Sequence, residues 1–292
     1  MKLTDFNIIY LTRESNQDRQ KHIESILDNI GVEYAKVFSI EPELFKNQSY
    51  RVKISRHLKI PIRKLNISWL FNNDNFKRRT KVLDKHIQDV CTLLSHFKCI
   101  KLANKKNLNN LLVLEDTADI LEGAENIEFE VPNDASIVYF GGLLQKVWDY
   151  PNDLKKENDF IKITPNQCKV YGTFAYALNS EKNIQFLHKS FIRIFSDKKE
   201  AYDTLRRFLI KNSRIRGQSI DLHLINYYQK QYNTYLFNPL LVAHRNIYLS
   251  DKTIHGTTFQ ERYYSLAKNQ ILQPELELKF RKINQLSDVK FD

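Results

Sequence analysis

Three carboxylates stand close together at one point of the sequence: Glu115, Asp116 and Asp119 follow the apolar run of residues 111–114. Carboxylates this close repel one another unless a cation or a group of donors compensates their charge. Hard oxygen ligands of this kind suit Mg²⁺ or Mn²⁺, in particular an ion that bridges a diphosphate. The alternative is structural, because acids that follow a strand and begin a helix complement the helix dipole. The cluster alone leaves both interpretations open.

Two other segments carry groups that could act on a substrate or an ion. Asp221 follows Ser219, a residue type common at helix N-caps, and would lie in the first helical turn. There it could be a catalytic base or could only complement the dipole. His244 follows the apolar run of residues 240–243 and could be a metal ligand or a packed core residue. For both residues the sequence alone favours the structural role.

Ser95 and His96 are adjacent in a segment with helical periodicity. Adjacent helical residues point in different directions, so these two do not form a nucleophile–base pair. The chain also contains no G-x-S-x-G motif, which argues against serine-hydrolase chemistry. We expect both side chains to be structural, satisfied by a neighbouring carbonyl or carboxylate.

The elements that must position these residues alternate between strands and helices. Residues 6–11 and 32–38 are predicted strands with a helix between them, which is a βαβ opening and implies a parallel sheet. Continuous apolar runs predict buried strands at residues 111–114 and 137–141. Because open parallel sheets bind ligands at the carboxyl ends of their strands, the acidic cluster stands at an expected place.

The rest of the chain continues this α/β pattern. Strands are predicted at residues 169–178 and 235–237, and helices at 84–104, 181–192, 199–212 and 219–231. Residues 143–166 are polar and are predicted to be an excursion without regular structure.

No strong linker divides the chain, so we predict one domain over residues 1–251 and a charged C-terminal extension at 252–292. Residues 41–80 have poor periodicity and form a basic insertion. Its cations include Arg51, Lys53, Arg56, Lys59, Arg63, Lys64, Lys77, Arg78 and Arg79. The insertion is either a solvated, partly ordered loop or an arm that binds an acceptor or a phosphate.

The composition is basic, with 45 Lys and Arg against 34 Asp and Glu and a net charge of +11. Such a charge favours anionic partners, among them nucleic acid, acidic glycans, anionic lipids and nucleotide sugars. The three cysteines form no CxxC pair and indicate neither a disulfide framework nor a zinc site. There is no signal-peptide pattern and no apolar stretch of about 18 residues, so a cytoplasmic location is expected.

Several segments, taken in order, resemble the family 25 glycosyltransferases, the lipooligosaccharide and collagen galactosyltransferase group. The opening strand with Arg13 and Arg19 resembles that family's "NL-x-R/D-R" pattern. Further similarities are residues 91–96 to "GC-x-x-SH", 111–116 to "hhhLEDD", 172–178 to "GT-x-x-Y-x-h", 220–221 to "h-D" and 238–251 to "P-x-h-x-Q…SD". The resemblance spans about residues 6–251.

This resemblance implies the GT-A glycosyltransferase fold, a Rossmann-like, mostly parallel sheet flanked by helices, with a mixed C-terminal half. It implies a sugar donor linked to a nucleotide, with UDP as the expected nucleotide, and a hydroxyl acceptor on a glycan, a lipid-linked glycan or a protein. Arg13, Arg19, Glu115 and Asp116 would bind the donor, and Asp221 would be the catalytic base. Asp116, Asp119 and His244 would be the ligands of Mn²⁺ or Mg²⁺.

Two departures from the family pattern bear on activity. Thr117 stands where the family has a third acid, and the last acid of such a motif usually contacts the metal; His244 stands in place of a Gln. These changes keep two alternatives open. One is a degenerate, non-catalytic glycosyltransferase that acts as a sugar-binding or scaffold protein. The other is a glycosyltransferase that modifies viral DNA bases, which the basic insertion suggests although no nucleic-acid-binding module is recognisable.

Overall fold

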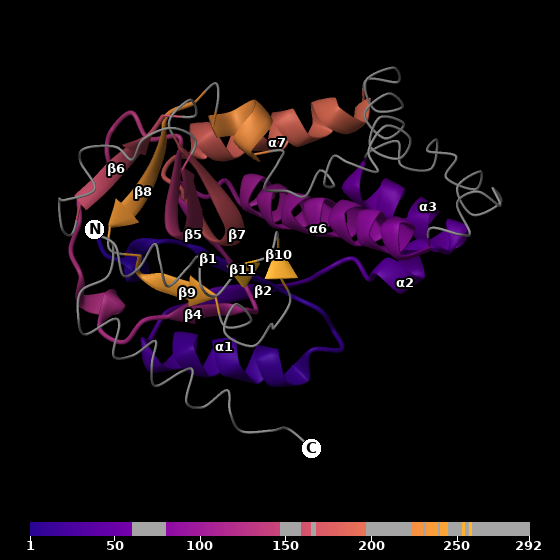
Figure 1. The fold of residues 1–292 in the computed structure, drawn as a ribbon, viewed down its shortest axis with the longest axis horizontal. Coiled ribbons are helices and arrows are strands. Elements are labelled where there is room, and N and C mark those ends of the chain that lie inside the picture. Colours follow the sequence, from indigo (N-terminus) through magenta and orange to yellow (C-terminus); the bar gives the residue numbers. More distant parts are fainter. Residues whose placement is uncertain are drawn as a thin grey trace.

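A computed structural model describes residues 1–59, 80–146, 159–164, 168–196, 224–229, 232–238, 240–244, 253–254 and 257–258. Within these ranges the chain forms a seven-stranded sheet with helices on both sides (Figure 1). No helix in these ranges is both long enough and apolar enough to cross a membrane.

The first half of the sheet is parallel. Its elements are β1 (Ile8–Thr12), α1 (Gln17–Asn29), β2 (Tyr34–Phe38), α6 (Thr80–Lys105) and β3 (Leu111–Glu115). β1 pairs in parallel with β2 on one side and with β3 on the other. Because such crossovers are right-handed, the two connections must cover opposite faces of the sheet. Figure 1 shows α1 on one side and α6 on the other.

The second half of the sheet is mixed. It contains β5 (Ile137–Lys146), β6 (Asp159–Ile163), β7 (Cys168–Leu178) and β8 (Thr234–Asn238), and the full order is β2-β1-β3-β7-β5-β8-β6. β7 is antiparallel to both β3 and β5, and β6 is antiparallel to β8. All other strands share one direction. The predicted α/β sheet, with a mixed C-terminal half, is therefore confirmed.

The described structure also contains smaller elements. β4 (Ala118–Ile120) pairs antiparallel with β9 (Val242–His244), and β10 (Thr253–Ile254) pairs with β11 (Thr257–Thr258). Helix α7 (Glu181–Ser196) packs on α6, and a π-helix covers Leu224–Gln229. Whether residues 252–292 form a separate extension stays a prediction.

The expectation of irregular structure was wrong in two places. Residues 41–59 form α2 (Pro42–Phe45) and α3 (Gln48–Leu58). Arg51 hides the periodicity of α3, because this cation is buried and donates to the carbonyls of Phe45 (2.9 Å) and Lys46 (2.7 Å). Residues 60–79, the rest of the basic insertion, lie outside the described ranges.

The second error concerns residues 143–166. β5 runs on to Lys146, and β6 begins at Asp159. The register of β5 against β7 shifts on both sides of Gly141, so the apolar run ends before the strand does. Gly141 is needed here because a Cβ atom would lie 2.6 Å from the carbonyl oxygen of Val242 in β9.

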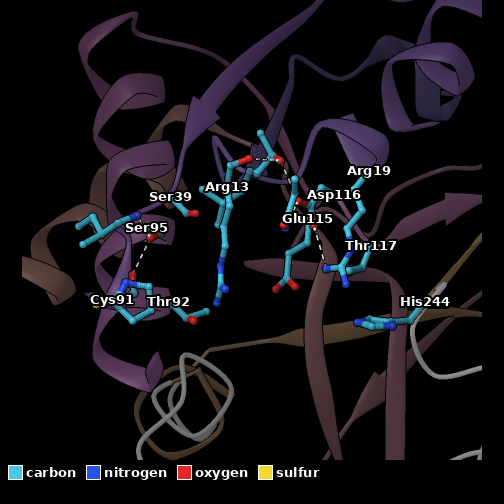
Figure 2. A pocket seen from close by; sticks show the side chains of 15 residues that line it. Arg13, Arg19, Ser39, Cys91, Thr92, Ser95, Glu115, Asp116, Thr117 and His244 are labelled. Carbon is cyan, nitrogen blue, oxygen red and sulfur yellow. Dashed lines mark hydrogen bonds and ion pairs between the residues drawn. The ribbon is translucent and has the colours of Figure 1, made fainter. Parts of the chain in front are cut away.

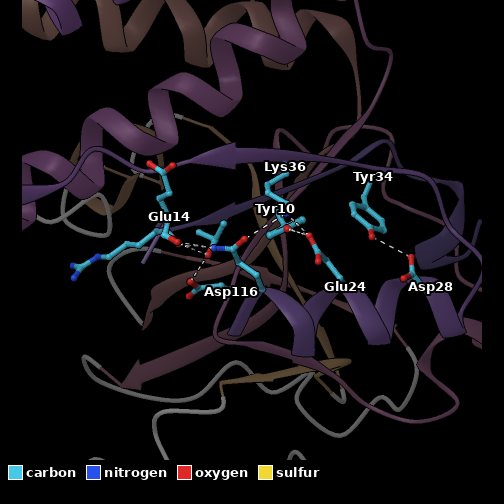
Figure 3. Close-up of polar contacts among 10 residues, drawn as sticks. Tyr10, Glu14, Glu24, Asp28, Tyr34, Lys36 and Asp116 are labelled. Atoms are coloured by element: carbon cyan, nitrogen blue, oxygen red, sulfur yellow. Dashed lines mark hydrogen bonds and ion pairs between the residues drawn. The ribbon is translucent and has the colours of Figure 1, made fainter. Parts of the chain in front are cut away.

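Polar contacts fix α1 to the edge of the sheet (Figure 3). The buried Tyr10 hydroxyl donates to Glu24 of α1, and Lys36 of β2 pairs with the same carboxylate at 2.6 Å. The hydrogen bond from Lys36, followed by the one from Tyr10, lowers the pKa of Glu24 despite partial burial. Tyr34 adds a hydrogen bond of 3.0 Å to Asp28. These contacts hold the second half of α1 against β1 and β2.

Candidate active site

A pocket of about 410 Å³ lies where β1 and β3 end. Its wall comes from the residues after β1, the start of α1, the segment after β2, the middle of α6, the residues that end β3 and the end of β9. Figure 2 shows Thr92 and Ser95 on one side, His244 on the other, and Arg13 and Glu115 between them. Because β1 has β2 on one side and β3 on the other, the pocket occupies the point where the strand order reverses.

Asp116 joins three of the elements around the pocket. One carboxylate oxygen, Oδ2, accepts hydrogen bonds from the Thr12 hydroxyl (2.7 Å) and the Asn16 amide (3.2 Å). The other oxygen, Oδ1, lies 3.7 Å from a guanidinium nitrogen of Arg19. Asp116 is buried, so these contacts replace the water that its charge would otherwise require. The residue therefore connects the ends of β1 and β3 to the start of α1.

Glu115 faces the pocket and is held from behind. Its Oε1 atom accepts a hydrogen bond from the Thr173 hydroxyl (2.7 Å) and lies 3.2 Å from Nε2 of His96. Since an ionised carboxylate only accepts, Nε2 must carry a proton. The other ring nitrogen, Nδ1, lies 3.2 Å from the Tyr176 hydroxyl, which can donate or accept. His96 and Tyr176 are fully buried, whereas the Glu115 side chain is 25% exposed.

These contacts decide the charge of Glu115. Burial acts to raise the pKa of this carboxyl group. The hydrogen bond and the electrostatic attraction of His96, the attraction of His244 and the Thr173 hydroxyl outweigh burial and lower the pKa to about 2. Glu115 is thus an ionised acceptor at neutral pH and a poor proton-transfer group, because a general base works best with a pKa near the operating pH.

His244 closes the pocket on the side opposite α6. Its ring packs edge-on against Phe174, with ring centroids 5.0 Å apart. Burial lowers the pKa of His244, although the charge of Glu115 acts in the opposite direction. The sequence left open whether His244 is a metal ligand or a packed core residue. In the structure its side chain lies against the core and also lines the pocket.

Two arginines bring positive charge to the pocket. Arg19 lies on α1 and pairs with Asp116. Arg13 follows β1, and Figure 2 shows its side chain extended into the pocket toward α6. Arg13 is exposed, and no carboxylate among the described residues pairs with its guanidinium. The four residues predicted to bind a donor, Arg13, Arg19, Glu115 and Asp116, therefore all line one pocket.

Asp119 is placed differently from the other predicted site residues. It lies on β4, its Oδ1 atom is 3.3 Å from Nε2 of His22 on α1, and it does not line the pocket. Thr117, which stands where an acid was expected, does line the pocket. It is 5% exposed, and its hydroxyl has no hydrogen-bond partner among the described residues.

Ser95 has the structural role expected of it. Its hydroxyl donates to the carbonyl of Cys91 (2.6 Å) and accepts from the backbone amide of Ile40 (2.8 Å), which fixes α6 to the segment after β2. Cys91 is buried, and burial raises the pKa of its thiol. His96, on the next helical position, turns to a carboxylate, as expected.

The sequence did not indicate that Thr12, Asn16, Thr173 and Tyr176 support the acidic cluster. The signal that could have suggested this is their place in the sequence: Thr173 and Tyr176 lie within the family-like segment of residues 172–178, Thr12 ends β1, and Asn16 precedes α1. Asp221, the predicted base, lies outside the described residues. Within the described ranges, no group of three or more His, Cys, Asp or Glu side chains is arranged to hold a metal ion.

Comparison with known proteins gives only distant structural likenesses. No protein-family profile matches the chain, and no curated protein matches it. Among solved structures, the chain is similar to a glycosyltransferase involved in the glycosylation of the major capsid of PBCV-1, with a TM-score of 0.30 and 10% identity. The alignment covers 90% of this chain and 99% of that one. A TM-score this low assigns neither fold nor function to this chain.

Proposed function

We propose that this protein transfers a sugar from a nucleotide-sugar donor to a hydroxyl group of an acceptor. The observation that carries the proposal is the position and lining of the pocket. It lies at the carboxyl ends of β1 and β3, where the strand order reverses, and it contains Arg13 and Arg19 beside Glu115 and Asp116. Doubly wound sheets bind nucleotides at this point of the fold.

The size and charge of the pocket suit such a donor. Its volume of about 410 Å³ lies within the range of roughly 300–1,000 Å³ typical of small-molecule sites. The guanidinium groups offer paired donors that match phosphate oxygens. The ionised Glu115 can accept hydrogen bonds from hydroxyl groups of the ligand. Together these groups match a ligand that carries both phosphates and hydroxyls.

Membership of family 25, the GT-A fold and a UDP-linked donor form the finer part of the proposal. They rest on the ordered sequence resemblance over about residues 6–251. On the same basis the acceptor is a hydroxyl group of a glycan, a lipid-linked glycan or a protein. UDP-sugars are therefore the first donors to test.

The reaction replaces one bond at the anomeric carbon of the sugar by another. The acceptor oxygen forms a bond to this carbon while the bond between the carbon and the diphosphate oxygen breaks. The nucleoside diphosphate leaves with the electron pair of the broken bond. A base takes the proton of the acceptor hydroxyl, and Asp221 is the residue predicted for this role. Donors that hold the diphosphate stabilise the charge that develops on it.

The predicted metal ligands do not fit a divalent ion. Both oxygens of Asp116 are engaged by Thr12, Asn16 and Arg19, and Asp119 is turned toward His22 outside the pocket. His244 is the remaining member of the set. No step of the proposed reaction is therefore assigned to Mn²⁺ or Mg²⁺.

A donor and acceptor screen tests the function. We expect one UDP-sugar to be consumed, with release of UDP and transfer of the sugar to a glycan or protein acceptor. Asp221→Asn should abolish transfer and leave UDP binding intact, and Asp116→Asn should also lose transfer. Full activity in both variants would refute the assignment of these residues.

Binding without transfer is the second candidate function, and Thr117 in place of an acid favours it. Calorimetric titration with UDP-sugars, followed by analysis of the products, separates the two. A donor that binds but is neither hydrolysed nor transferred with any acceptor would establish a sugar-binding or scaffold role.

A DNA acceptor has one supporting observation. Helix α3 contains no acid, and Lys53, Arg56 and the adjoining Lys59 are exposed. Binding of duplex DNA to these cations would have to weaken steeply with salt. Absence of binding even at low salt would exclude this acceptor.

A further inference from the structure

The pocket combines two features that point to one property of its ligand site. Most of the carboxylate oxygens in it accept hydrogen bonds or pair with cations of the protein, whereas one of its arginines pairs with no described carboxylate. This combination bears on how the site neutralises a diphosphate, which a divalent cation does in many nucleotide sites.

The carboxylates leave few oxygens for a cation. Asp116 has hydrogen-bond donors or an arginine at both oxygens. Glu115 has two donors on Oε1, so only its second oxygen is open toward the pocket among the described residues. Asp119 faces His22 and lies outside the pocket lining. One open carboxylate oxygen is a poor set for an ion that prefers six oxygen ligands in ordered geometry.

Thr117 supports the same conclusion. It lines the pocket beside Asp116, is nine-tenths buried, and its hydroxyl has no partner among the described residues. A hydroxyl is neutral and can donate a hydrogen bond to a phosphate oxygen, which a carboxylate at this position could not do.

The positive charge comes from the segment between β1 and α1. The Arg13 guanidinium enters the pocket, and no described carboxylate neutralises it. Arg19 shares its charge with Asp116 at 3.7 Å. A divalent ion placed among these groups would be repelled by Arg13, while a diphosphate would be attracted by it.

We infer that the pocket binds the diphosphate of its donor without a divalent cation, through Arg13, Arg19 and the Thr117 hydroxyl. The inference rests on the proposed function, because it takes a nucleoside diphosphate as the ligand. It adds that arginines supply the charge which the sequence resemblance assigns to Mn²⁺ or Mg²⁺.

Calorimetry with nucleoside diphosphates tests the inference on the full chain. UDP, GDP, CDP and ADP are titrated in EDTA and, separately, in Mn²⁺. We expect the best ligand to bind with the same Kd in both, within about threefold. A larger gain of affinity in Mn²⁺ would overturn the inference and leave the proposed function standing. Failure of all four to bind in either condition would overturn the proposed function and the inference together.

Three variants test which side chains bind the diphosphate. Arg13→Gln should raise the Kd roughly tenfold or more, because it removes a charge-assisted contact. Lys21→Gln is the matched control, since it removes an exposed cation on α1 that does not line the pocket. Equal affinity of Arg13→Gln and Lys21→Gln for the nucleotide would overturn the role of Arg13.

Thr117→Asp restores the acid that the family pattern has. The new carboxylate should repel the diphosphate, so affinity in EDTA should fall roughly tenfold, and Mn²⁺ should recover at least part of it. Circular dichroism and thermal unfolding check that the variant folds. A folded Thr117→Asp that binds in EDTA as tightly as the unaltered protein would place the diphosphate away from residue 117 and overturn the inference.

Discussion

The two halves of the sheet use their side chains in opposite ways. Where β1 and β3 end, charged and hydroxyl groups surround a pocket and hold one another in place. The mixed half instead contains an aromatic cluster, formed by Phe129, Phe140, Phe160 and Phe237. All four rings are buried, and their centroids lie 4.9–6.2 Å apart.

The difference shows where the fold can carry chemistry. In the parallel half, the reversal of strand order separates two chain connections and leaves space that polar groups can line. In the mixed half, β7, β5 and β8 are neighbouring strands with no such reversal between them. There the aromatic rings pack against one another and fill the space. Substitutions in the aromatic cluster should therefore affect mainly stability, and substitutions around the pocket mainly binding.

The largest effect is expected from Phe237→Ala in the aromatic cluster. Removal of a fully buried ring should reduce the free energy of unfolding by about 3–5 kcal/mol, because a cavity remains. Nucleotide affinity of the folded protein should not change. Urea unfolding and calorimetry measure the two quantities. Phe186→Ala, at a ring that is 38% exposed, is the control and should cost less. An equal loss in both variants would contradict the comparison.

The second effect concerns Glu115 and depends on pH. Its folded pKa of about 2 lies below the ordinary value of 4.5. Its contribution to stability is therefore fully present above about pH 4.5 and is lost as the pH falls through about 2, and it is on the order of 2–3 kcal/mol.

Glu115→Gln should remove this contribution. The difference in unfolding free energy between the unaltered protein and the variant should be constant near neutral pH and shrink as the pH falls below about 4.5. Urea unfolding at several pH values measures it. Glu33→Gln, at an exposed carboxylate, is the control. A difference that stays constant down to about pH 3 would show that His96 and Thr173 do not hold the carboxylate as described.

A smaller effect on stability is expected at Asp116. Asp116→Asn removes the charge that pairs with Arg19 and replaces one of the two acceptor oxygens by an amide group, at a cost of about 1–2 kcal/mol. Nucleotide affinity should fall as well, since Arg19 loses the group that orients it. Asp119→Asn is the matched control, because its partner His22 lies outside the pocket lining. If Asp119→Asn lost as much nucleotide affinity as Asp116→Asn, Asp119 would contribute to the binding site after all.

The smallest effect is expected in the mixed half, at its surface. Asp134 accepts hydrogen bonds from Tyr235 (2.7 Å), Asn233 (2.8 Å) and Lys162 (2.9 Å), but its side chain is 49% exposed. Water and salt screen such contacts, so Asp134→Asn should cost at most about 1 kcal/mol. Thermal unfolding at low and high salt measures the effect. A loss comparable with that of Phe237→Ala would show that this half is not held mainly by its aromatic rings.

Much of the fold could be predicted from the sequence, because local patterns are sufficient for it. Apolar runs located the buried strands at residues 111–114 and 137–141, and helical periodicity located the long helix that carries Ser95 and His96. The prediction failed where burial is polar or the strand is irregular. Arg51 occupies the buried face of α3, and Gly141 interrupts the register of β5.

The sequence by itself determined that an acidic cluster follows a buried strand and that Arg13 and Arg19 follow another. Only the tertiary structure decided which of these carboxylates bind other protein groups and which carboxylate oxygen is left for a ligand. Asp116 meets Thr12, 104 residues away, Glu115 meets Thr173, 58 residues away, and Asp119 turns to His22, 97 residues away. The physical reason is that the charge of a carboxylate and the number of its free oxygens depend on the hydrogen-bond donors around it. Donors this distant in sequence are brought together only by the packing of the sheet and its helices.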